Sequence, residues 1–145
     1  MDTREQKPLP FKIEGYITEI RKVKLDVGDY GCLYQDGSQS PLYFERKSIP
    51  DLFGTLGKGH HRFKREIERS KASNATLVIL IEGTLSDVYA GVPQSEVKGE
   101  SIVKTLFSLY MRYDIVPMFV KSRAEMVEII RESFEAIGRL EKVKT

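Results

Sequence analysis

The sequence predicts an α/β fold in which a mixed β-sheet is flanked by helices on both faces. Residues 75–81 form a continuous apolar run of strand length, which is typical of a strand buried on both faces. Residues 101–113 and 123–137 repeat apolar side chains at helical spacing, and residues 116–120 form a short strand between them. Strands that alternate with helices in this way favour a sheet covered by helices.

The first third of the chain predicts three more strands, over residues 15–25, 29–34 and 42–47. The Asp-Gly-Ser cluster at 36–38 predicts a turn that joins the last two strands into a hairpin. No internal repeat, low-complexity tract or shift in composition marks a second domain. We therefore expect residues 1–145 to form one domain.

Capping residues predict where the helices begin and end. Ser48 is the predicted N-cap of a short helix, with Asp51 in the place of the acidic partner of a capping box. A second helix is expected over residues 60–71. The last helix should begin after Ser122 and end at Gly138, because glycine commonly terminates helices.

Composition describes an ordinary soluble protein, and we expect it to be intracellular and cytoplasmic. Of its 145 residues, 41% are hydrophobic and 30% are charged. No apolar run approaches the length of about 20 residues that a membrane span needs, and the first residues lack the apolar stretch of a secretory signal. Cys32 is the only cysteine, which excludes an internal disulfide and a cysteine-based zinc site. We expect Cys32 to be buried.

Positive charge is concentrated in one segment. The formal net charge of the chain is +2, whereas residues 58–71 contain six lysines and arginines and two glutamates, a net of +4. A locally basic segment indicates an anionic partner at one face. The alternative is a solvated helix with Arg62–Glu66 and Lys64–Glu68 ion pairs.

The sequence Glu45-Arg46-Lys47 ends one predicted strand immediately before a helix start. Side chains alternate along a strand, so Glu45 and Lys47 should share one face and Arg46 should lie on the other. A carboxylate beside an ammonium group suits metal-assisted phosphodiester cleavage. The alternative interpretation is a hairpin strand with surface charges.

Other carboxylates could complete a metal site. Asp29 lies between two glycines, and it is either a turn residue or a magnesium ligand on the strand that pairs with the one carrying Glu45. Asp2 and Glu5 could serve a second metal position, although the residue types alone favour an ordinary chain terminus.

These blocks together resemble the nuclease domain of the XPF/Hef family of structure-specific DNA endonucleases. The family pattern is Gly-Asp, a variable spacer, and then Glu-Arg-Lys-x-x-x-Asp, which is matched by Gly28-Asp29 and by residues 45–51. Asp2-x-Arg4-Glu5 resembles the opening block of the family, with Met1 in the place of valine, and the Ile-Glu-Gly sequence at 81–83 resembles the end of its following strand. The resemblance covers nearly the whole chain, and its blocks occur in the family's order.

The resemblance implies a restriction-endonuclease-like fold and a role for each matching residue. Asp29, Glu45, the carbonyl of Arg46 and Asp2 would hold Mg²⁺ or Mn²⁺. Lys47 would orient or help deprotonate the attacking water, or neutralise charge on the phosphate. Glu5 would lie close enough to serve a second ion or its waters. Asp51 would orient the site through Arg46, and its role as a helix cap explains it equally well.

The resemblance also implies DNA as the partner and a homodimer as the assembly. The expected DNA contacts are Arg4, Arg46, Lys58, His61, Arg62, Arg65 and Arg69. The expected substrate is branched or flapped DNA in repair, recombination or replication. The helicase region and helix-hairpin-helix module of larger family members have no counterpart in this sequence, which is more similar to the small free-standing members of viruses and prokaryotes. The alternative function is a catalytically silent DNA-binding or partner subunit.

Overall fold

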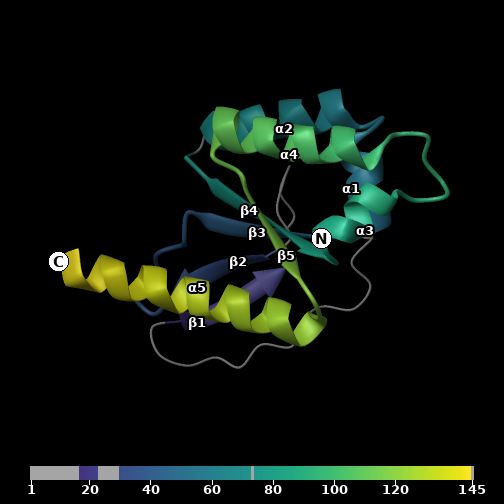
Figure 1. The fold of residues 1–145 in the computed structure, drawn as a ribbon. Coiled ribbons are helices and arrows are strands. Elements are labelled where there is room, and N and C mark those ends of the chain that lie inside the picture. The colour runs from purple at the N-terminus through teal and green to yellow at the C-terminus, as the bar shows by residue number, and fades with distance from the viewer. Residues whose placement is uncertain (1–16, 23–29, 73, 145) are drawn as a thin grey trace.

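A single mixed sheet forms the centre of the molecule. The computed structural model describes residues 17–22, 30–72 and 74–144 (Figure 1). The described strands follow the order β1-β2-β3-β4-β5 across the sheet. They are β1 (Ile17–Lys22), β2 (Tyr30–Tyr34), β3 (Leu42–Ser48), β4 (Thr76–Glu82) and β5 (Val116–Val120). The first three strands are antiparallel neighbours and the last three are parallel, so the predicted mixed sheet is confirmed.

Helices cover both faces of the sheet, as the sequence predicts (Figure 1). One face carries the four helices α1 (Ile49–Leu56), α2 (His60–Ala72), α3 (Leu85–Ala90) and α4 (Gly99–Tyr113). The other face carries α5 (Arg123–Lys144). Each face therefore has its own layer of apolar side chains.

The α5 face of the sheet is closed by aromatic packing. Phe44 of β3 meets Phe134 of α5 edge to face, with 5.3 Å between the ring centroids. The hydroxyl of Tyr34 donates a 2.9 Å hydrogen bond to the carbonyl oxygen of Phe134. These contacts fix the position of α5 against β2 and β3.

The opposite face packs β4 against α1, α2 and α4. Ile79 and Ile81 point into this layer, where they meet buried residues such as Phe53, Ile67 and Ile102. Leu80, between them, packs into the layer under α5. Strand β4 is thus buried on both faces, which the apolar run at 75–81 predicted.

The predicted hairpin is confirmed between β2 and β3. The amide of Gly37 donates a 3.0 Å hydrogen bond to the carbonyl oxygen of Tyr34, and Gly37 has a φ of 87°, which favours glycine. This turn connects β2 to the strand that carries Glu45, Arg46 and Lys47.

Two helices differ from the sequence predictions. Helix α5 does not end at Gly138 but runs on to Lys144, because good helix formers follow and an interior glycine costs only about 1 kcal/mol. Helix α3 was not predicted, although Thr84 and Asp87 form a reciprocal capping box at its start. Its six residues are too few for a periodic apolar pattern to be recognised.

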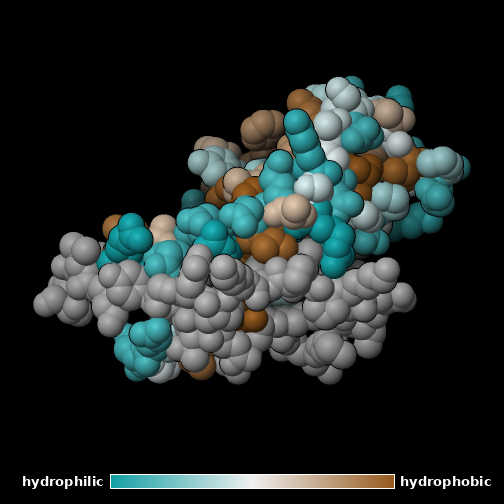
Figure 2. All heavy atoms as spheres, turned by 90° about the horizontal axis from the view of Figure 1, so that it is seen from below, coloured by the Kyte–Doolittle hydropathy of each residue, from teal (hydrophilic) through white to brown (hydrophobic). Residues whose placement is uncertain are grey.

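Figure 2 shows one face of the molecule, seen from below. The described side chains visible there are mostly hydrophilic, with hydrophobic ones interspersed. Among the described residues, no helix is both long and apolar enough to cross a bilayer.

Candidate nuclease site

The candidate site is built on β3, the middle strand of the sheet. Strand β3 pairs with β2 through Tyr30 and Phe44, and it pairs in parallel with β4 from Leu42 to Ser48. Its carboxyl end passes directly into α1 at Ile49. Ligand sites of open α/β sheets lie at such carboxyl ends, so residues 45–47 occupy a favourable position.

Glu45 and Lys47 lie on the same face of β3, as strand alternation predicts. Both are buried, with 6% and 4% of their surface exposed. The distance between Lys47 Nζ and Glu45 Oε2 is 4.0 Å, which is an ion pair but longer than a hydrogen bond. Their β4 neighbours Ile79 and Ile81 surround the pair with apolar side chains.

Such burial costs free energy. Removing two charges from water offsets much of their attraction, and well-packed apolar residues in place of a buried ion pair are often neutral or stabilising. Buried charges in a sheet centre therefore point to chemistry rather than to stability. Glu45 and Lys47 are the described residues for which this argument is strongest.

Arg46 lies on the opposite face of β3, as predicted. Arg46 Nη2 is 3.8 Å from Glu82 Oε1 at the end of β4, where Glu82 stands beside Ser48 in the strand register. The sequence placed Glu82 in a family block, but its proximity to Arg46 was not predicted, because that proximity depends on the register between strands far apart in the chain. The available signal was a carboxylate that directly follows the apolar run at 75–81.

Ser48 caps α1 as predicted. Its Oγ accepts a 3.2 Å hydrogen bond from the backbone amide of Asp51. The Asp51 side chain is exposed in the first turn of α1, where the helix dipole favours negative charge. Because α1 covers the face opposite to the Arg46 side chain, an orienting role of Asp51 through Arg46 stays a prediction.

Helix α2 buries two apolar residues and exposes its basic ones. Phe63 and Ile67 pack into the core, four residues apart. Arg62 Nε lies 3.4 Å from Glu66 Oε1, which is one of the ion pairs expected of a solvated helix. The exposed residues in and just before α2 include all five that were predicted to contact DNA here, namely Lys58, His61, Arg62, Arg65 and Arg69.

Two adjacent histidines, His60 and His61, stack at the start of α2. Their ring centroids are 5.6 Å apart. Burial lowers the pKa of His60, and the nearby charges of His61, Lys64 and Arg112 lower it further.

Comparison with known proteins identifies the family of the chain. A family model described as the ERCC4 domain matches residues 1–132. The chain belongs to the ERCC4-domain family. The resemblance of its sequence blocks to the XPF/Hef nuclease domain is thereby confirmed.

The fold of this ERCC4 domain is similar to that of XPF from Aeropyrum pernix. One such structure has a TM-score of 0.53 and 25% sequence identity, over 80% of this chain and 51% of that one. A second, of XPF from Aeropyrum pernix in complex with DNA, has a TM-score of 0.53 and 22% identity, over 83% and 52%. The chain thus spans about half the length of the XPF chains that it matches. No curated protein matches it.

Part of the predicted site lies outside the described residues of the ERCC4 domain. These are Asp2, Arg4, Glu5 and Asp29. Of the predicted metal-binding carboxylates, the structure therefore describes Glu45. Within the described ranges, no three His, Cys, Asp or Glu side chains gather closely enough to hold a metal ion. Carboxylate oxygens are the donors that Mg²⁺ and Mn²⁺ prefer, so Glu45 fits such an ion and supplies one of its ligands.

Proposed function

We propose that this ERCC4 domain is a DNA endonuclease that hydrolyses phosphodiester bonds with Mg²⁺ or Mn²⁺. The observation that carries the proposal is the buried Glu45–Lys47 pair at the carboxyl end of the central strand. Family membership and the similarity to XPF support nuclease chemistry. The XPF structure in complex with DNA supports DNA as the substrate.

The proposed metal ligands are Asp29, Glu45, the Arg46 carbonyl and Asp2. The strand register supports Asp29, because Tyr30 pairs with Phe44 in an antiparallel ladder. If this ladder continued by one residue, Asp29 would stand opposite Glu45 on the same face, at the distance of adjacent strands of about 4.8 Å. Two carboxylates at that separation can share one divalent cation.

Each side chain has a separate task in the proposed reaction. The bound cation would polarise the phosphate and lower the pKa of the attacking water. Lys47 would orient that water or neutralise charge on the phosphate, from a buried position that water screens poorly. Glu5 and Asp2 would hold a second ion or its waters, and Asp51 would orient the site. The water oxygen forms the new bond to phosphorus while the bond to the departing oxygen breaks.

The basic surface of α2 would hold the DNA backbone. Lys58, His61, Arg62, Arg65 and Arg69 are exposed on one segment. Arginine forks match phosphate oxygens, and phosphate contacts fix the register of a protein on DNA. Arg4 and Arg46 would add contacts nearer to the cleavage centre. Because XPF matches over only part of its length, branched or flapped DNA as the substrate is itself a proposal.

A homodimer is proposed through an apolar surface of α4 and β5. Phe107, Tyr110 and Met111 lie three and four residues apart on α4, and all are exposed, Met111 by 77%. Phe119 on β5, the edge strand of the described sheet, is also exposed. We call these four residues the α4–β5 surface. An exposed apolar group of this kind marks an interaction site, and a two-fold contact would cover both copies.

The proposed setting is DNA repair, recombination or replication inside the cell. The alternative is a catalytically silent subunit that binds the same DNA and assists an active partner. Only the absence of cleavage would separate this alternative from the first proposal.

A nicking assay on a flap duplex tests the proposal. The wild-type protein should nick the duplex in Mg²⁺ or Mn²⁺, and a chelator should abolish the nicking. Glu45→Gln and Asp29→Asn should each lower the rate at least about 100-fold, because a metal ligand is lost, while DNA affinity stays near that of the wild type.

The matched control is Glu128→Gln, which removes an exposed carboxylate on α5 and should cleave at the wild-type rate. Full activity of the Glu45 and Asp29 variants would refute the ligand assignment. Tight binding of the wild type with no nicking in either metal would establish the silent subunit instead.

A further inference from the structure

Glu82 ends β4 at the same edge of the sheet as the candidate site. It stands beside Ser48 of β3 and Val120 of β5 in the parallel ladders, so its backbone is paired on both sides. Leu80, two residues earlier, packs under α5, so the Glu82 side chain also lies on the α5 face of the sheet, as Arg46 does. None of the roles assigned above uses the Glu82 carboxylate.

The Arg46 guanidinium lies between the interior of the domain and water. Only 16% of the Arg46 side chain is exposed, and its Nη2 is 3.8 Å from Glu82 Oε1. This distance is longer than a hydrogen bond, so the two groups are connected by the attraction between their charges. A guanidinium carries several N–H donors in a fixed fork, and an ion pair at one nitrogen leaves the others for a further acceptor.

The turn after Glu82 is fixed by close packing. Gly83 has a φ of 151°, and a Cβ there would lie 2.9 Å from the side chain of Ile49, the first residue of α1. The Gly83 amide donates a 2.9 Å hydrogen bond to the carbonyl oxygen of Val120. The Glu82 carboxylate therefore reaches toward Arg46 from a backbone whose position is set by three elements of the fold.

Arg46 connects this carboxylate to the candidate site. It lies between Glu45 and Lys47 in β3, and these three residues pair in register with Ile79 to Ile81 of β4. DNA held by Arg46 would therefore be held at the end of the strand that carries the buried Glu45–Lys47 pair.

We propose that Glu82 is a positioning residue that orients the Arg46 guanidinium toward a phosphate of the DNA. This rests on the proposed function, in which Arg46 contacts DNA, and it adds a residue to the same site. Glu82 itself would not touch the DNA, because a carboxylate repels phosphate. Its charge would restrict the rotamers of Arg46 before binding, and a side chain that is already ordered loses less conformational entropy when it binds.

A double-mutant cycle in DNA affinity tests this proposal. Affinity for a flap duplex is measured by fluorescence anisotropy in chelator, where no cleavage interferes. Glu82→Gln should weaken binding about fivefold, the upper range for a partly exposed ion pair, and should have no effect in an Arg46→Gln background. Glu82→Asp keeps the charge and should bind more tightly than Glu82→Gln.

The sign of the effect separates positioning from simple electrostatics. Removing a negative charge near DNA strengthens binding if that charge only repels phosphates. Weaker binding of Glu82→Gln therefore requires a role through another group. Urea unfolding of Glu82→Gln should give nearly the wild-type free energy of unfolding, because 42% of the Glu82 side chain is exposed.

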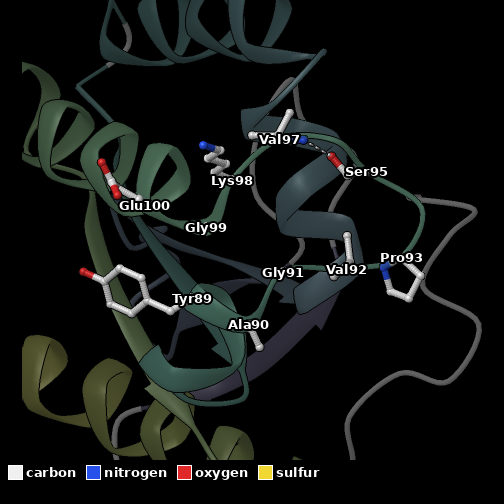
Figure 3. A pocket seen from close by; sticks show the side chains of 10 residues that line it. All are labelled: Tyr89, Ala90, Gly91, Val92, Pro93, Ser95, Val97, Lys98, Gly99 and Glu100. Atoms are coloured by element: carbon white, nitrogen blue, oxygen red, sulfur yellow. Dashed lines mark hydrogen bonds between the residues drawn. The ribbon is translucent and has the colours of Figure 1, made fainter.

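Glu100→Gln is the matched control. Glu100 is also an exposed carboxylate in an ion pair, 3.1 Å from Lys104. It lines a pocket between the end of α3 and the start of α4, to which neither β3 nor β4 contributes a residue (Figure 3). Its removal should leave DNA affinity unchanged.

The failure of this inference differs from failure of the proposed function. Equal or tighter binding of Glu82→Gln, or the same loss with and without Arg46, would overturn the inference alone. A wild type that binds DNA but does not nick it would refute the nuclease, and the cycle would still decide the role of Glu82. A wild type that does not bind DNA would overturn both. Glu82→Ala provides a second variant without the charge if Glu82→Gln does not fold.

Discussion

At the scale of single residues, burial and charge conflict most at Glu45 and Lys47. Both side chains are almost fully buried, and each is the other's ion-pair partner. Removing one member of such a pair leaves a buried charge, which costs about 3–5 kcal/mol. The Arg46–Glu82 pair is closer to water, because 42% of the Glu82 side chain is exposed. Water screens this ion pair, so its contribution to the free energy of unfolding is small. The buried Glu45–Lys47 pair therefore serves a purpose other than stability.

Cys32 should be unreactive in the folded protein. Burial, and secondarily the Glu135 carboxylate, raise the pKa of its thiol to about 12. Only the thiolate is nucleophilic, so at pH 8 iodoacetamide should alkylate folded Cys32 far more slowly than the unfolded chain. Mass spectrometry of samples with and without denaturant measures both rates. Equal rates would mean that Cys32 is accessible in the native state.

The same pKa predicts the direction of a pH effect on stability. The folded state retains the thiol proton up to about pH 12, whereas the unfolded state loses it near pH 8.5. The contribution of Cys32 to the free energy of unfolding is therefore complete below that pH and is lost as the pH rises toward 12. Cys32→Ala, measured by urea unfolding at several pH values, should show a shallower decline.

The sequence was sufficient to predict some residue positions and insufficient for others. The shared face of Glu45 and Lys47 follows from their separation by two residues in one strand. The proximity of Arg46 to Glu82 does not, because it depends on how β3 and β4 are aligned. Ser48 was predicted as the N-cap of α1, and the hydrogen bond that its side chain accepts from the Asp51 amide confirms that role.

At the scale of elements, α2 is the proposed contact with the DNA backbone. Arg65 is exposed on this helix. Replacing it with glutamine should reduce affinity for duplex DNA equally across sequences, and should lower the log–log salt slope by about 0.9 for the lost phosphate contact. Fluorescence anisotropy over a range of salt concentrations measures both quantities.

Arg139→Gln is the matched control for this helix, because it removes an exposed arginine from α5 on the other side of the sheet. It should leave both affinity and salt slope unchanged. Identical salt slopes for Arg65→Gln and the wild type would show that Arg65 is an exposed surface residue that makes no phosphate contact.

Elements were predictable where periodicity extended over many residues. Helix α4 and strand β4 show this, because their apolar patterns are long and regular. Helix α3 was missed because it is short, and the end of α5 was misplaced because Gly138 is buried within a helix that continues. Local stop signals are overridden when the residues beyond them favour the helix.

At the scale of the whole molecule, we expect a homodimer that uses the α4–β5 surface. Met111→Glu places a charge at its most exposed residue and should convert a dimer into a monomer, because a charge buried in an apolar contact is costly. Light scattering after size-exclusion chromatography measures the mass. Leu140→Glu, at an exposed leucine of α5, should leave the mass unchanged. A wild type that is monomeric at high concentration would contradict the dimer.

The fold as a whole was predictable because its pattern of strands and helices excludes most alternatives. The order of the sheet, with β3 in the middle, was not predictable from periodicity, since pairing joins segments distant in the chain. The same limit applies to the candidate site, whose carboxylates come from separate segments. Membership in the ERCC4-domain family supplied the link between them.

Anomalous scattering from crystals soaked in Mn²⁺ tests the central claim most directly. We expect a peak about 2 Å from a carboxylate oxygen of Glu45, with a carboxylate of Asp29 also in contact. Glu45→Gln crystals under the same conditions should lose or weaken that peak. A wild-type map without manganese at Glu45, or with manganese bound only elsewhere, would contradict the claim that this strand holds a catalytic cation.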